Sequence, residues 1–94
     1  MTDLLLLAVI VDAASFKSYE EARDALDTII WQLNTIANKM SSDESPADQQ
    51  KMQQLASFLS VFGHTMNDRN YPALAYSHHY RQAVKLVTKY SRYL

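Results

Sequence analysis

The stretch "SYEEARDALDTIIWQLNTIANKM", residues 18–40, decides the fold class of this chain. Ser18 is followed three residues later by Glu21. This is the spacing of a capping box, in which a hydroxyl and a carboxylate each satisfy a backbone amide at a helix start. Apolar residues then recur alternately four and three positions apart, at Ala22, Leu26, Ile29, Leu33, Ile36 and Met40. Because that spacing draws one stripe along a helix, it predicts an amphipathic helix that runs to about residue 40.

The N-terminal run "LLLLAVIV", residues 4–11, is apolar on every side of a helix. A helix needs roughly 20 apolar residues to span a bilayer, so this run is too short. A secretory signal would begin with positive charge, whereas Asp3 precedes the run and Asp12 closes it. We therefore predict a buried helix over residues 3–14, with a strand or a targeting segment as the alternatives.

Two further helices follow from the breaks in the pattern. Ser45 and Pro46 are typical of a helix start, because proline at the first position loses no hydrogen bond. That helix carries an apolar stripe at Met52, Leu55, Leu59 and Phe62. It is predicted to end near Phe62 with Gly63 as a left-handed cap, or one turn later at Met66. Pro72 is predicted to open the last helix, whose stripe comprises Tyr76, Tyr80, Ala83, Val87, Tyr90 and Leu94.

Together these patterns predict an all-α fold in one domain, residues 1–94. Seams with two apolar residues per heptad pack at about 20° in helical bundles. The single glycine and two prolines leave few turns for a sandwich or barrel. We expect a small antiparallel four-helix bundle whose first helix is largely buried.

The net charge of −1 hides a strong asymmetry. Residues 1–68 carry ten acidic and four basic side chains, and residues 69–94 carry five basic side chains and no acidic one. Such an asymmetry indicates either a charged partner or two parts of one fold that attract each other.

The last helix separates its tyrosines from its cations. Tyr76, Tyr80 and Tyr90 lie on the apolar side, and the opposite side carries Arg81, Lys85, Lys89 and Arg92. Single-strand nucleic-acid binders stack bases on rings that lie beside the cations, so this arrangement disfavours a stacking platform. A contact with duplex phosphates and a merely solvated polar face remain as alternatives.

The second helix carries the opposite charge and an unusual tryptophan. Trp31 falls on the polar side of the helix, in the company of Asp24 and Asp27. An exposed tryptophan forgoes favourable burial, so either another segment covers Trp31 or it anchors an interface, where tryptophan is enriched. Because the acidic and basic faces both point away from their apolar seams, we expect them not to meet within one molecule. They could meet between molecules in a homodimer.

No pattern of catalytic or metal-binding residues stands out. His78 and His79 are neighbours and diverge on a helix, whereas a helical metal pair needs spacing of three or four. The chain has no cysteine and one glycine, which leaves no thiolate site and no glycine-rich phosphate loop. We therefore expect no cofactor, no metal and no enzymatic activity.

The function predicted from these features is that of a small cytoplasmic protein–protein interaction module. An inhibitor, an immunity-type protein or a regulatory adaptor would act in this way, by occluding or scaffolding a partner protein whose identity stays open. The residues predicted to bind the partner are Trp31, Asp24, Asp27, Arg81, Lys85, Lys89 and Arg92. The alternatives are a binder of duplex nucleic-acid backbones through the basic face and a structural homo-oligomer. We expect no membrane association.

Overall fold

The computed structural model describes residues 16–40 and 44–94, and this part of the chain is helical, as predicted. Its elements are α2 (Tyr19–Lys39), α3 (Pro46–Thr65), α4 (Ala73–Tyr76), α5 (His78–Lys89) and the 3₁₀ turn η1 (Ser91–Tyr93). The helix predicted over residues 3–14 lies outside the described residues. No helix of the described part combines the length and the apolar character needed to cross a membrane.

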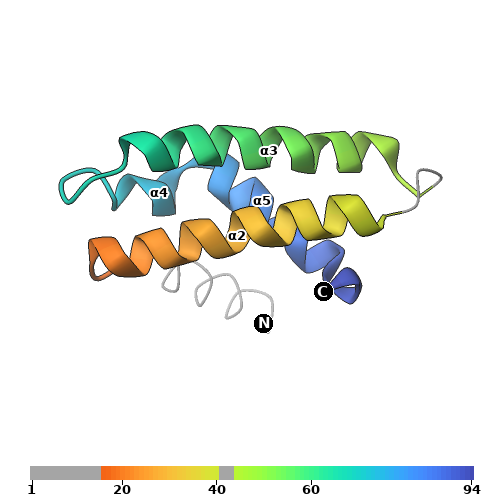
Figure 1. The fold of residues 1–94 in the computed structure, drawn as a ribbon, viewed down its shortest axis with the longest axis horizontal. Coiled ribbons are helices and arrows are strands. Elements are labelled where there is room, and N and C mark those ends of the chain that lie inside the picture. The colour runs from red at the N-terminus through yellow and green to blue at the C-terminus, as the bar shows by residue number, and fades with distance from the viewer. Residues whose placement is uncertain (1–15, 41–43) are drawn as a thin grey trace, which may run out of the picture.

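The two long helices, α2 and α3, lie side by side and run in opposite directions, and α5 crosses them obliquely (Figure 1). The core lies where these three helices meet. Its largest fully buried side chains are Leu26, Leu33, Ile36, Met52, Leu59 and Leu74. Ala83, Val87 and Tyr90 of the C-terminal segment are also buried. The described helices therefore share one hydrophobic core.

Helix α2 begins and ends where its sequence predicts. Ser18 Oγ accepts a hydrogen bond from the Glu21 amide at 3.1 Å. The Glu21 carboxylate accepts one from the Lys17 amide at 3.3 Å, one residue earlier than in a standard capping box. All the residues of the predicted stripe, from Ala22 to Met40, are buried.

Helix α3 starts as predicted and ends at Thr65 with Met66 as its C-cap, which agrees with the later of the two predicted ends. Ser45 Oγ accepts a hydrogen bond from the Asp48 amide at 3.3 Å, and Pro46 is the first helical residue. The prediction that Gly63 caps the helix is wrong: Gly63 is helical and buried, and its φ is not positive. A Cβ at Gly63 would lie 3.0 Å from Leu26 Cδ2, so the glycine admits a close approach of α2.

The predicted last helix is divided in two. It breaks at Ser77, which has an extended ψ of 128°. The Ser77 hydroxyl accepts a hydrogen bond from the Tyr80 amide at 3.4 Å, and thereby caps α5. Because the break changes the helical phase, Tyr76 is 72% exposed and does not join the apolar stripe. The 3₁₀ turn that follows α5 likewise leaves Leu94 47% exposed.

Candidate interaction surfaces

The outer face of α2 carries an exposed tryptophan. Trp31 is 62% exposed, and Asp24 and Asp27 are also exposed. On a helix, positions 24, 27 and 31 are three and four residues apart and therefore neighbours on one surface. The structure thus brings together the three predicted residues of this helix, which we name the Trp31 face.

Arg23 fixes one edge of the Trp31 face. Its Nη1 donates a hydrogen bond to the Gly63 carbonyl of α3 at 2.7 Å. Its Nε lies 3.5 Å from Asp27 Oδ2 in an exposed ion pair. A side chain that is tied to α3 therefore also orients the Asp27 carboxylate.

Two predicted cations, Arg81 and Lys85, lie on the exposed surface of α5. They are four residues apart and therefore one helical turn from each other. Arg81 Nε donates to the Ala75 carbonyl at 3.4 Å, across the break at Ser77. Neither side chain forms an ion pair with a carboxylate of the described residues.

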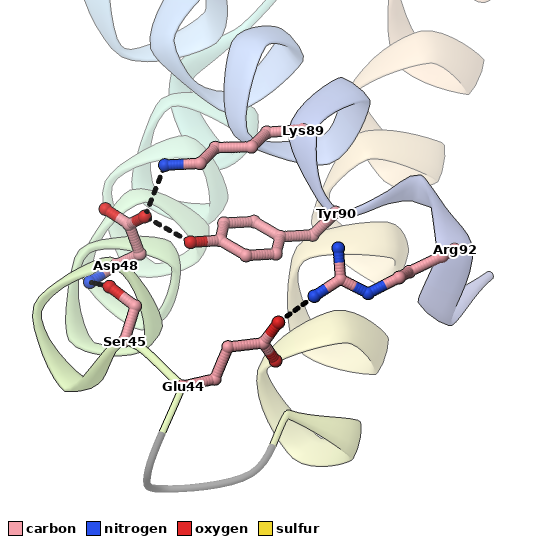
Figure 2. A network of polar contacts seen from close by, with 6 residues as sticks. All are labelled: Glu44, Ser45, Asp48, Lys89, Tyr90 and Arg92. Atoms are coloured by element: carbon pink, nitrogen blue, oxygen red, sulfur yellow. Dashed lines mark hydrogen bonds and ion pairs between the residues drawn. The ribbon is translucent and has the colours of Figure 1, made fainter.

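The other two cations are paired within the chain, at the start of α3. Lys89 Nζ lies 3.2 Å from Asp48 Oδ2, and the Arg92 guanidinium pairs with Glu44 (Figure 2). The Tyr90 hydroxyl donates to Asp48 beside Lys89. We name this group of residues the C-terminal clamp: Glu44, Ser45, Asp48, Lys89, Tyr90 and Arg92. It joins the α2–α3 loop and the first turn of α3 to the last residues of the chain.

Charge and hydrogen bonding reinforce one another in the C-terminal clamp. The hydrogen bond from Tyr90, followed by that from Lys89, holds the pKa of Asp48 below its ordinary value. The same carboxylate raises the pKa of Lys89. Both pKa shifts show that the contact favours the ionised forms of Asp48 and Lys89, as expected for opposite charges in contact.

The clamp resolves part of the charge asymmetry. Of the two explanations, attraction between two parts of one fold holds for Lys89 and Arg92. Their partners are not the acids of α2, which agrees with the expectation that the α2 and α5 faces do not meet. The sequence interpretation missed Glu44 and Asp48 as partners, because charge content alone does not say which acid a cation reaches.

A groove with a volume of about 370 Å³ lies between α2 and α5. Ile29, Val84 and Val87 contribute apolar side chains, and Asp24 and Gln32 mark its ends along α2. Tyr80 also lines the groove, and burial raises the pKa of its hydroxyl. The groove is therefore mostly apolar.

Exposed apolar side chains also lie on α3. Phe58 is 54% and Val61 is 63% exposed. The Phe58 ring stacks on His79 of α5 at a centroid distance of 4.7 Å. This surface belongs to a different helix from the Trp31 face.

The described residues contain no cluster of three or more histidine or acidic side chains that could hold a metal ion. In that part of the chain, every buried side-chain nitrogen and oxygen also has a hydrogen-bond partner. The features that stand out are thus surfaces, namely an exposed tryptophan with carboxylates and an exposed pair of cations. Comparisons with protein-family models, curated proteins and solved structures gave no match.

Proposed function

We propose that this chain is a non-enzymatic interaction module that binds another protein through the Trp31 face. The observation that carries the proposal is the 62% exposure of Trp31 on the outer side of α2, next to the exposed carboxylates of Asp24 and Asp27. Truncation of a tryptophan hot spot in an interface costs at least about 2 kcal/mol. Trp31 supplies the apolar anchor, and Asp24 and Asp27 favour a partner with basic side chains around an apolar pocket.

The basic face of α5 provides a second contact. Arg81 and Lys85 are free to meet a partner's carboxylates, because neither is paired with an acid of the described residues. Lys89 and Arg92 can exchange their clamp partners at little cost, since exposed ion pairs are worth about 0–1 kcal/mol. These charges set orientation and association rate more than affinity. The module acts by occluding or scaffolding its partner, as an inhibitor, an immunity-type protein or a regulatory adaptor does.

The pairing of Lys89 and Arg92 counts against the nucleic-acid alternative. Affinity for duplex phosphates grows with the number of cations that displace counterions. Two of the four cations on this face already neutralise carboxylates of the same chain. For the whole chain, we propose the antiparallel four-helix bundle predicted above, with residues 3–14 as its largely buried first helix and a location in the cytoplasm.

The test is affinity capture with the tagged chain from a nuclease-treated extract of the cells that produce it. Trp31→Ala is compared with the wild type and with Tyr76→Ala, which removes an aromatic side chain of α4 that is at least as exposed as Trp31. We expect one stoichiometric protein, retained by the wild type and by Tyr76→Ala. Its affinity for Trp31→Ala should be about 30-fold weaker, which corresponds to about 2 kcal/mol.

Two results would count against the proposal. Equal retention by the wild type and Trp31→Ala would remove the Trp31 face from the interface. Binding to duplex DNA that weakens steeply with salt, and that Lys85→Glu abolishes, would favour the nucleic-acid alternative. Light scattering at micromolar concentration tests the homo-oligomer alternative. A homo-oligomer would have at least twice the monomer mass, and Trp31→Ala would lower the measured mass.

A further inference from the structure

The groove between α2 and α5 is lined mainly by apolar side chains. Of the apolar residues that line it, Ile29 and Val87 are buried, and Val84 and Tyr80 are partly buried. Asp24 is the charged side chain among the residues that line it. This chemistry suits an occupant that is itself apolar and nearly uncharged.

The described chain begins at one end of this groove. The Phe16 ring packs edge-on against Tyr80, with the ring centroids 6.0 Å apart. The Tyr71 hydroxyl donates a hydrogen bond to the Lys17 carbonyl at 3.4 Å. These two contacts hold residues 16 and 17 in place. Because Tyr80 lines the groove, Phe16 lies next to it.

The chain that precedes Phe16 has the composition and the length to fill the groove. Residues 4–11 read "LLLLAVIV" and carry no charge. As a helix, the 12 residues from position 3 to position 14 extend about 18 Å. Along α2 the groove runs from Asp24 to Gln32, which is about 12 Å at the same rise. The segment is therefore long enough to cover it.

We propose that the groove between α2 and α5 is the docking site of residues 3–14 of the same chain. The segment enters at the Phe16–Tyr80 contact and runs antiparallel to α2, as short connections between helices favour. Its apolar side chains cover Ile29, Val84 and Val87. This proposal rests on the first helix of the bundle proposed above. The groove shares Asp24 with the Trp31 face, but Trp31 and Asp27 do not line it.

The chain has no cysteine, so an engineered pair reports proximity directly. Thr28→Cys, at an exposed position that lines the groove, is combined with a cysteine at each position from 4 to 11 in turn. A disulfide requires Cα atoms within about 7 Å of each other. The control combines the same cysteines with Gln53→Cys on the exposed surface of α3. Circular dichroism confirms that each variant folds.

Under mild oxidation of purified protein, we expect disulfides within one chain for Thr28→Cys. They should form at positions three or four residues apart and be lost at the positions between, because one face of a helix meets the groove. The Gln53→Cys series should form none.

Three results would overturn the proposal. Equal reaction in the two series, or no reaction with Thr28→Cys, would place the segment elsewhere. Disulfides that join two chains would show that a second copy fills the groove. Since no partner is present in this experiment, its failure is distinct from failure of the function proposed for Trp31.

Discussion

At the scale of single residues, the Asp48 carboxylate binds two groups of the C-terminal segment at once. It accepts a hydrogen bond from the Tyr90 hydroxyl and lies 3.2 Å from Lys89 Nζ. Tyr90 is only 4% exposed, so little water is available to replace a lost partner. A buried hydroxyl without a partner costs about 1–3 kcal/mol.

We therefore expect Asp48→Ala to lower the free energy of unfolding by roughly 1–3 kcal/mol, measured by urea denaturation. Adding Tyr90→Phe removes the orphaned hydroxyl, so the double variant should recover part of the loss. Asp68→Ala, in the exposed loop before α4, serves as the control and should change stability by about 0.5 kcal/mol or less. Strictly additive losses at positions 48 and 90 would show that the two groups are not coupled.

The same carboxylate predicts the response to acid. The pKa of Asp48 is lower in the folded chain than its ordinary 3.8. The ionised form therefore contributes stability that is present above pH 3.8 and is lost as the pH falls through the folded-state pKa. We expect the urea midpoint of the wild type to fall more steeply below pH 4 than that of Asp48→Asn. Parallel curves for the two proteins would mean that Asp48 does not contribute to acid sensitivity.

At the scale of helices, Ser77 separates α4 from α5. Its hydroxyl accepts from the Tyr80 amide, and it satisfies one of the free donors at the start of α5. Ser77→Ala should destabilise the fold by about 0.5–2 kcal/mol, the usual cost of losing such a cap. Ser57→Ala, at an exposed position inside α3, should be neutral or slightly stabilising, since alanine is the better helix former. Equal effects of the two substitutions in urea denaturation would argue against a helix start at His78.

The helices differ in how well the sequence predicts them. The starts of α2 and α3 are predictable because a capping serine, Ser18 or Ser45, stands directly before an apolar stripe. The break at Ser77 is not predicted from the sequence, because the spacing of apolar residues continues across it and therefore indicates one continuous helix. Gly63 was misassigned because a glycine can end a helix or admit a neighbour. The choice depends on Leu26 and Arg23, which belong to a different helix.

At the scale of the whole molecule, long-range contacts were the least predictable. The charge asymmetry indicates either a charged partner or an attraction within the fold, and it does not identify Glu44 and Asp48 as the partners of Arg92 and Lys89. Those pairs join residues more than 40 positions apart, and they depend on how α5 crosses α3. The placement of Trp31 opposite the apolar stripe of α2, in contrast, follows from helical periodicity alone, and its exposure agrees with that placement. Its role in binding stays a prediction.

Substitutions at buried and at exposed positions of α2 should differ in their effect on stability. Leu33 is fully buried, so Leu33→Ala should cost about 2–5 kcal/mol. Trp31→Ala, two residues away but 62% exposed, should change the free energy of unfolding by about 0.5 kcal/mol or less. Thermal or urea denaturation of the two variants checks this contrast. A large loss for Trp31→Ala would mean that the indole is part of the core and not available to a partner.

The most direct measurement places a photo-reactive amino acid at position 31 and follows cross-linking in the cells that produce the protein. The same group at position 76, an exposed aromatic position on α4, is the control. We expect one discrete adduct with another protein from position 31 and none from position 76. No adduct at position 31, or the same adducts from both positions, would contradict the claim that the Trp31 face binds a partner.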